Sequence, residues 1–301
     1  EAISKIKNKK FMRWSDKNFA FIRPIKNIFA NMDKKFIKIN FMKIPSENKI
    51  IGHRFSQMSD KKIKSFDDYL NFLKKSDVIL DFESRKKKIL DEIKKIEKKE
   101  KVYVNSDIDL INHVSNLTEH PRVLMGSFDK SFLKIPKEVI NSIMKNHQKY
   151  FSVYSTSKMS SLVSKFIFVA GSPYLDNNKV VKGNEKVLAA RLNDGKFFYE
   201  EDIKSGLEKI RDKIDHITFI EGIGSYGDKA RRVGKLALKI RDMLGLNIDV
   251  DDIIKTSELC KADLASQMVF EFPELQGIMG GYYYLNTNCL LYTSPSPRDD
   301  R

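Results

Sequence analysis

The sequence predicts an α+β fold, with a mixed α/β N-terminal region followed by an all-helical domain. Segments rich in β-branched and aromatic residues lie within the first 170 positions, whereas helical periodicity dominates after residue 183. At 301 residues the chain is long enough for about two domains. We therefore expect the fold to change character near residue 200.

Residues 1–60 are expected to form a β-rich region. Residues 19–25 and 36–44 contain many β-forming residues, and in the second segment Ile37, Ile39 and Phe41 alternate with polar residues. Alternation with a period of two is typical of a half-buried strand. We therefore predict one strand in each segment.

Residues 61–105 are expected to form a charged helical insertion. Ile89, Ile93 and Ile96 recur at helical spacing, while lysine and glutamate occupy the other positions. A solvated helical face is the simpler interpretation of this charge run, and an RNA-binding arm is the alternative.

Residues 106–200 are expected to mix strands with helices. Residues 121–128, 147–154 and 165–170 have the composition of strands, and Pro136 indicates a short helix between the first two. Residues 201–285 are expected to be helical.

The last segment, residues 286–301, shares neither the lysine-rich composition nor the periodicity of the rest. We interpret it as a disordered or artefactual tail that takes no part in the fold. Because the chain begins with Glu, we also expect it to be an internal piece of a longer protein.

The chain carries a formal net charge of +15, with 55 Lys and Arg residues. Such a charge suits a nucleic-acid partner, because bound Lys and Arg release counterions from phosphates. A lysine-rich proteome would produce the same excess, so the charge alone leaves both interpretations open.

No apolar run approaches the ~18 residues of a membrane helix. The two cysteines lack C-x-x-C spacing, which favours a reducing, cytoplasmic setting.

Gly222, Gly224 and Gly227 have the G-x-G-x-x-G spacing of a dinucleotide-binding turn. That motif needs a strand directly before its first glycine. Apolar residues recur from Ile203 to Ile217 at spacings of 4, 3, 4 and 3, which predicts that residues 217–220 continue a helix. We therefore expect a helix-to-helix turn rather than a nucleotide site.

No motif in the sequence indicates catalysis by this chain alone. The patterns G-x-x-x-x-G-K-[ST] and G-x-S-x-G are absent, and no histidine follows His216. Ser157 to Ser161 is similar to the lysine loop of class I aminoacyl-tRNA synthetases, but it lacks a partnering histidine motif and is interpreted as a polar turn. We therefore expect neither a catalytic residue nor a metal site.

Three dense segments of polar, aromatic and aliphatic residues lie at 146–151, 183–198 and 261–283. Together they resemble the β subunit of bacterial glycyl-tRNA synthetase of the α2β2 type. The resemblance runs in the family's order from Met12 through the sequence GHRF at 52–55 to Tyr283, and the third segment is the most specific. Departures occur at Gly195, Gly281 and Tyr284, and the resemblance ends after Leu285.

This resemblance implies the β chain of a glycine–tRNA ligase, whose holoenzyme attaches glycine to tRNA(Gly) at the expense of ATP. It implies that the aminoacylation site, with its ATP and Mg, lies on the α subunit, and that this chain holds no cofactor. The implied partners are the α subunit and tRNA(Gly), without DNA or membrane. It also implies that residues 201–285 form an HD-like domain with a degenerate metal site.

Within this interpretation, exposed basic residues are expected to contact RNA phosphates. The candidates are Arg54, Lys149, Lys182, Arg231 and Arg232. Other residues of the three segments are expected to hold structure, with Asp263 as a remnant of the HD signature. These are His147, Tyr150, Arg191, Asp194, Asp263, Glu271 and Gln276. A buried pair of Arg191 with Asp194 is one possible arrangement.

Two alternative functions stay open at this point. The first is an HD-type metal-dependent phosphohydrolase, which would hydrolyse nucleotides once Mn or Mg is added. The second is a lysine-rich, non-catalytic interaction scaffold. Co-purification with an α subunit, and charging of tRNA only by the mixture, would exclude both.

Overall fold

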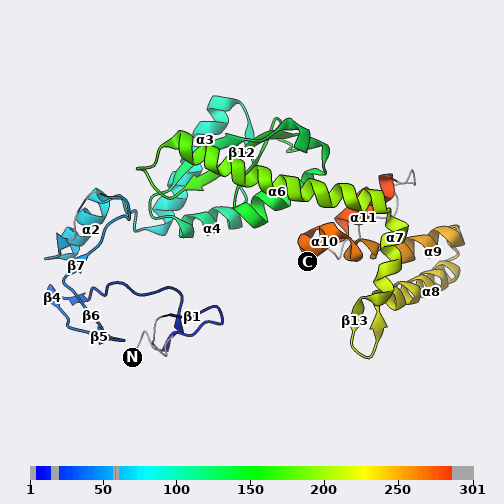
Figure 1. Ribbon diagram of the computed structural model, residues 1–301, viewed down its shortest axis with the longest axis horizontal. Helices are drawn as coiled ribbons and strands as arrows, with labels where there is room; N and C mark the ends of the chain where they lie inside the picture. The colour runs from blue at the N-terminus through cyan, green and yellow to red at the C-terminus, as the bar shows by residue number, and fades with distance from the viewer. Residues whose placement is uncertain (1–4, 15–19, 57, 59–60, 287–301) are drawn as a thin grey trace. The chain divides into compact units, whose positions relative to one another are not determined.

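The structure is a computed structural model that describes residues 5–14, 20–56, 58 and 61–286. Helices and strands both contribute, which confirms the α+β class. Figure 1 shows the course of the chain and labels its helices and strands. The chain divides into two compact units. The first comprises residues 1–89, 115–122 and 170–175, and the second comprises residues 90–114, 123–169 and 176–301.

The first unit begins with short antiparallel strand pairs. These pairs are β1 (Met12–Arg13) with β2 (Ala20–Phe21), β3 (Asn31–Met32) with β4 (Lys35–Phe36), β5 (Asn40–Phe41) with β6 (Ile44–Pro45), and β7 (Lys49–Ile50) with β8 (Lys61–Lys62).

The single alternating strand predicted at residues 36–44 is wrong. Asp33 and Lys34 have positive φ values, as do Met42 and Lys43. Two consecutive residues with positive φ make the tight turns that join short hairpins. The chain therefore reverses direction on both sides of residues 37–39, which leaves Ile37 and Ile39 exposed.

The core of the first unit forms around helix α2 (Phe66–Lys75). The Ser65 hydroxyl accepts a hydrogen bond from the Asp68 N–H at 3.1 Å, which caps the first turn of this helix. Phe72 and Leu73 from α2 pack with Ile50 and Ile63. Helix α3 (Phe82–Glu100) follows.

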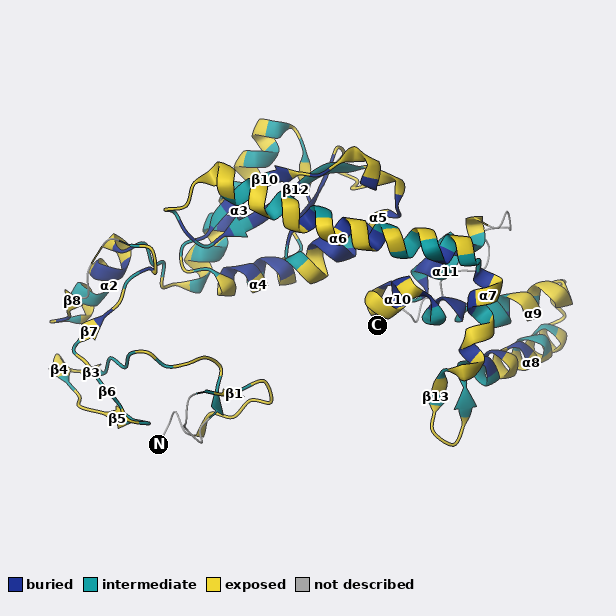
Figure 2. Ribbon diagram, viewed as in Figure 1, coloured by how far each residue is buried: buried dark blue, intermediate teal, exposed yellow. Residues whose placement is uncertain are grey.

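The second unit contains a four-stranded sheet in the order β10–β12–β11–β9. The strands are β9 (Tyr103–Val104), β10 (Arg122–Ser127), β11 (Phe151–Tyr154) and β12 (Leu162–Ala170). Strand β11 pairs antiparallel with both neighbours. The short helices between the strands are α4 (Ile108–Leu117), η1 (Lys130–Lys134), α5 (Lys137–Ser142) and the π-helical turn η2 (Ile143–Gln148). Buried residues follow the strands and one side of α6 (Asn177–Ser205) (Figure 2).

The strand predicted at residues 147–154 begins later than expected. His147 and Gln148 belong to η2, and Lys149 takes a left-handed conformation with φ of 60°. This conformation lets the Tyr150 N–H donate to the Met144 carbonyl at 2.7 Å, which closes the end of the helical turn. The polar part of the segment therefore ends a helix, and only residues 151–154 pair in the sheet.

Helix α6 is continuous over 29 residues, so no break in the chain lies at residue 200. The elements that follow it are α7 (Leu207–Asp212), η3 (Lys213–His216), β13 (Thr218–Ile220), β14 (Gly224–Ser225), α8 (Tyr226–Leu244), α9 (Val250–Leu259), η4 (Ala262–Ala265), α10 (Gln267–Glu271), η5 (Pro273–Leu275) and α11 (Ile278–Asn286).

The tail predicted from residue 286 onward lies, apart from Asn286, outside the described residues. Among the described helices, none has the length and apolar character needed to cross a membrane.

Candidate nucleic-acid interface

The glycine-rich segment before α8 forms a β-hairpin. Strand β13 pairs antiparallel with β14, with Thr218 opposite Ser225. Gly222 and Gly224 have φ values of 80° and 113°, which glycine adopts without steric cost. The predicted helical extension through residues 217–220 is therefore wrong, and so is the helix-to-helix turn.

The hairpin does not form a dinucleotide-binding turn either. That turn follows a strand of a parallel sheet. Strand β13 pairs instead in a two-stranded antiparallel sheet, and β14 leads directly into α8. The spacing of the three glycines is thus explained by the hairpin and by the start of the helix.

Gly227 lets the first turn of α8 approach η3. A Cβ atom at this position would lie 1.7 Å from Oδ1 of Asp215 and 3.2 Å from its Cα atom. The 1.7 Å distance to Oδ1 is an overlap, so the Asp215 side chain would have to move to admit the added Cβ atom, and the 3.2 Å distance to the Asp215 Cα atom is tighter than an ordinary contact. The close approach brings the Asp215 carboxylate next to α8.

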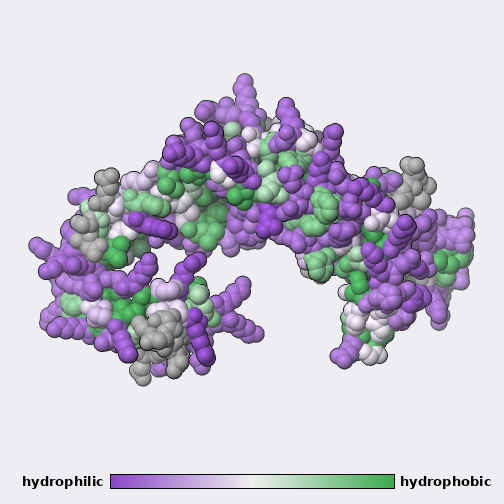
Figure 3. All heavy atoms as spheres, viewed as in Figure 1, coloured by the Kyte–Doolittle hydropathy of each residue, from purple (hydrophilic) through white to green (hydrophobic). Residues whose placement is uncertain are grey.

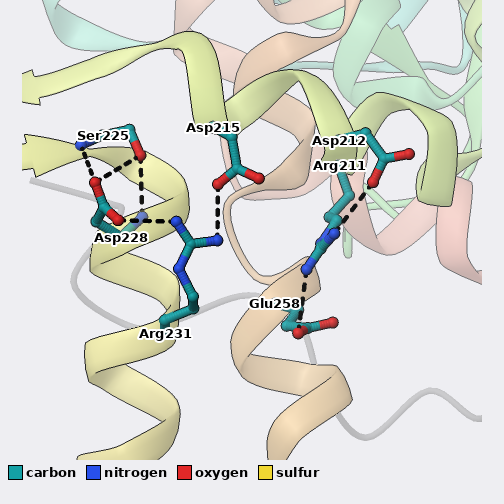
Figure 4. A network of polar contacts seen from close by, with 7 residues as sticks. All are labelled: Arg211, Asp212, Asp215, Ser225, Asp228, Arg231 and Glu258. Carbon is teal, nitrogen blue, oxygen red and sulfur yellow. Dashed lines mark hydrogen bonds and ion pairs between the residues drawn. The ribbon is translucent and has the colours of Figure 1, made fainter.

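A polar network surrounds the start of α8 (Figure 4). The Ser225 hydroxyl accepts from the Asp228 N–H at 3.1 Å, and the Asp228 carboxylate accepts from the Ser225 N–H at 2.9 Å. This is a reciprocal helix cap. Arg231 donates to Asp228 at 2.8 Å and to Asp215 at 2.9 Å. The hydrogen bond from Arg231, with those from Ser225, lowers the pKa of Asp228 to about 2.

Arg231 is therefore paired with two carboxylates, whereas Arg232 is not. The Arg232 guanidinium donates a 3.4 Å hydrogen bond to the Ile223 carbonyl and stays exposed. Lys235 and Lys239 follow on the same side of α8, three and seven residues further along, and both are exposed. We call Arg232, Lys235 and Lys239 the basic row. None of the three forms an ion pair with any residue that the structure describes.

The other three predicted phosphate contacts lie on separate elements. Arg54 belongs to the first unit, is exposed, and has its guanidinium 5.3 Å from the ring of Phe55. Lys149 donates from Nζ to the Asn146 carbonyl at 2.7 Å, and Lys182 is exposed on α6. Contact of these three residues with RNA stays a prediction.

The neighbouring His53, which was part of the GHRF sequence, is buried. Its Nε2 lies 2.7 Å from the Gly171 carbonyl oxygen, within the first unit. This hydrogen bond ties the segment before Arg54 to the end of β12. The sequence GHRF thus contains a buried structural residue followed by an exposed cation.

His147 and Tyr150 have structural contacts. The His147 ring packs edge-on against Phe272 at 4.9 Å, and its Nε2 lies 3.6 Å from the Glu274 carboxylate. Tyr150 is buried, stacks on Phe166 at 4.9 Å, and donates to Asn184 at 2.6 Å.

Glu274 was not among the predicted residues, although it joins η5 to η2. It accepts hydrogen bonds from Ser142 and from Asn146. Burial acts to raise the pKa of Glu274, but these hydrogen bonds and the charge of His147 lower it below its ordinary value. A single Glu in a helical segment gives no signal in the sequence that would have identified this role.

Asp263 is the residue for which the resemblance implied a structural role. It is buried, and its Oδ2 accepts from the N–H groups of Gly277 at 2.7 Å and Gly280 at 3.1 Å. These groups lie at the start of α11, so the carboxylate caps that helix. In the part of the chain that the structure describes, no cluster of three or more His, Cys, Asp or Glu could hold a metal ion.

Asp202 has an equivalent role that sequence reasoning missed. It is buried on α6 and accepts from the N–H groups of Gln267 and Met268, both at 2.9 Å. It also accepts from the Tyr283 hydroxyl at 2.7 Å. Burial, followed by the charge of Asp202, raises the pKa of Tyr283.

The remaining predicted residues lie near the surface. Arg191 and Asp194 approach to 3.8 Å, but their side chains are 46% and 54% exposed, so a buried pair is wrong. An exposed pair of this kind contributes roughly 0–1 kcal/mol. Glu271 is exposed at the end of α10, and the Gln276 N–H donates to the Pro273 carbonyl at 3.2 Å.

Comparison with known proteins gives consistent matches. The family model described as "Glycyl-tRNA synthetase beta subunit" matches residues 1–289. The glycine–tRNA ligase beta subunit of Listeria monocytogenes is 38% identical over 275 residues, covering 91% of this chain and 40% of the relative. The Rickettsia felis subunit is 37% identical over 285 residues, covering 94% and 42%. The Streptococcus suis subunit is 41% identical over 277 residues, covering 91% and 40%. The chain thus spans about two-fifths of the length of these relatives.

The close approach at Gly227 predicts opposite effects of two Gly→Ala substitutions. Gly227→Ala should lower the free energy of unfolding by about 1–3 kcal/mol, because the new Cβ overlaps Asp215. Gly183→Ala is the control, because Gly183 is an exposed position of α6 with no atom within 4 Å of the added Cβ. It should be neutral or stabilising by up to about 1 kcal/mol. Chemical denaturation of the full-length protein measures both, and equal effects would contradict the packing argument.

The raised pKa of Tyr150 leads us to expect a loss of stability at alkaline pH. Burial raises its pKa to about 12, above the ordinary value of 10.0. A raised pKa means that the fold favours the neutral phenol, so its contribution is complete below pH ~10 and declines as the pH rises towards about 12. The free energy of unfolding should therefore fall between pH 10 and 12, and less steeply in Tyr150→Phe. Identical slopes in the two proteins would refute this assignment.

Proposed function

Because this chain belongs to the family of glycyl-tRNA synthetase β subunits, we propose that it forms part of the β subunit of a cytoplasmic glycine–tRNA ligase. Such an enzyme attaches glycine to tRNA(Gly). The observation that carries the proposal is the continuous family match over residues 1–289. Since the chain spans about two-fifths of its relatives, the activity belongs to the longer protein and its partner.

Within this enzyme, the proposed role of the β chain is to hold tRNA and to assemble with the α subunit as α2β2. ATP, Mg and the aminoacylation site would lie on the α subunit. The contacts of Asp202 and Asp263 support this division, because both carboxylates already accept hydrogen bonds from helix N-termini. The helical region that contains Asp263 would then be an HD-like domain in which that aspartate caps a helix.

The proposed phosphate contact on α8 is the basic row. From Arg232 to Lys239 the helix rises by roughly 10 Å, so the three cations can follow a phosphate backbone. Arg231 donates to two carboxylates instead, so it offers little free charge to a phosphate. Of the two neighbouring arginines, Arg232 is therefore proposed to contact tRNA, and Arg231 to hold the start of α8 on η3.

The basic row predicts a change in the salt dependence of tRNA binding. The combined variant Arg232→Gln, Lys235→Gln and Lys239→Gln should weaken binding in the full-length holoenzyme. The slope of log K against log salt concentration should shrink by up to about 0.7–0.9 for each phosphate that the variant no longer neutralises. Titrations of tRNA(Gly) at several salt concentrations measure this slope.

Arg231→Gln is the matched control for the basic row. Because Arg231 is compensated by Asp215 and Asp228, its loss should lower the melting temperature while leaving the salt slope nearly unchanged. If the triple variant kept the wild-type slope, or if Arg231→Gln reduced it equally, the basic row would not be the phosphate contact.

The division between subunits predicts that neither subunit charges tRNA by itself. We expect radioactive glycine to be attached to tRNA(Gly), with ATP and Mg, only by the mixture of α subunit and full-length β subunit. Glycine-dependent ATP–pyrophosphate exchange by the β subunit alone would overturn the proposal. Nucleotide hydrolysis by the β subunit alone, stimulated by Mn, would favour a phosphohydrolase instead.

A further inference from the structure

Helix α8 has two apolar sides, and the described residues cover only one of them. Ala230 is buried, and Gly234 lies against α9, where an added Cβ would be 3.3 Å from the Ser257 side chain. A second set of apolar side chains is 42–77% exposed. We call this set the α8 apolar face: Val233, Leu236, Ile240, Met243 and Leu244.

The α8 apolar face forms one continuous surface. Spacings of three and four residues place its members on the same side of the helix, over roughly 16 Å from Val233 to Leu244. Leu246 and Ile248 in the connection to α9, and Val250 at the start of α9, are exposed as well. Apolar spheres emerge among polar ones at the surface of this part of the chain (Figure 3).

Such a surface indicates a missing contact. Soluble monomers rarely expose contiguous apolar patches larger than a few hundred Å². The α8 apolar face has the spacing of a helix that packs on a second neighbour, in addition to α9. We therefore interpret it as part of a protein core.

The charge beside this face limits what can cover it. Arg232 and Lys239 lie along one edge of the apolar face, and neither forms an ion pair with a described residue. Because the basic row is proposed to contact tRNA, this edge has to stay open, so a segment that covers the apolar face is a narrow amphipathic helix that leaves Arg232 and Lys239 exposed. The Lys235 side of α8 lies farther from this face and can stay open to solvent.

The length of the relatives indicates where such a helix comes from. The matched part is 40–43% of their chains, so more than half of each β chain lies outside the match. A segment of the same chain competes with separate partners at a high effective concentration. We propose that the α8 apolar face is covered, in the full-length β subunit, by an amphipathic helix from the part of that chain outside the present sequence. The inference rests on the proposed function, in that this chain is part of a longer β subunit, but it does not depend on tRNA binding.

Oxidation of Met243 tests this proposal without any substitution. Met243 is 77% exposed here, so its sulfur would react readily with peroxide unless another segment covers it. In the full-length β subunit alone, we expect oxidation at least about tenfold slower than in the same chain unfolded in guanidinium, at every protein concentration. Peptide mass spectrometry measures the rate at this residue.

The remaining outcomes each contradict the proposal. Native oxidation within about twofold of the unfolded rate would mean that the face is uncovered. Protection that appears only after the α subunit is added would assign the face to the α subunit. Protection that increases with the concentration of the β subunit would assign it to a second copy.

A pair of cysteine variants gives an independent measurement. Leu236→Cys lies on the α8 apolar face, whereas Lys235→Cys is its neighbour in the basic row. In the full-length β subunit alone, we expect a thiol reagent to modify Cys at 235 at least about tenfold faster than Cys at 236. Equal rates at the two positions would overturn the proposal.

Discussion

Hydrogen bonds between buried carboxylates and helix N-termini hold the helical end of this chain together. A helix leaves its first N–H groups without partners, and a buried carboxylate without donors is strongly unfavourable. Asp202 on α6 accepts from the start of α10 and from Tyr283 on α11, and Asp263 accepts from the start of α11. These carboxylates give the helix N–H groups their acceptors, and the N–H groups give the carboxylates their donors. The arrangement of α6, η4, α10 and α11 therefore depends on these two aspartates.

Hydrogen bonds within the fold also distinguish charged side chains that hold the structure together from those that are exposed to a binding partner. Asp202, Asp263 and Glu274 accept hydrogen bonds from within the fold, and Arg231 donates to two acidic neighbours. On α8, the exposed cations of the basic row form no ion pair with a described residue. A polar residue in a family segment therefore need not contact RNA, and the contacts of its side chain distinguish the two roles.

Local signals in the sequence predicted several elements but not the reversals between them. Pro136 precedes α5 as expected, and the lysine-rich segment after residue 82 is a helix. The turns at Asp33 and at Met42 could not be predicted, because residues other than glycine adopt positive φ there. The hairpin before α8 was hidden because Ile214 and Ile217 happen to continue the spacing of a helix.

The types of residue in the candidate site could be predicted from the sequence, but the contacts of their side chains could not. Exposed cations could be selected from the sequence, but the pairing of Arg231 depends on Asp215, which comes close only because Gly227 lacks a side chain. Asp202 was missed for a similar reason, since its donors lie more than sixty residues away. Long-range pairings of this kind leave no periodic trace in the sequence.

The unbroken course of α6 has a mechanical consequence. This helix is roughly 43 Å long. Its buried Leu188 and Leu192 anchor the middle, while Asp202 is bound to α10 near the other end. A sharp kink would disrupt backbone hydrogen bonds, and no proline interrupts its sequence. A load applied to the helices at its C-terminal end would thus be transmitted to the sheet region as by a stiff rod, and the two would turn together.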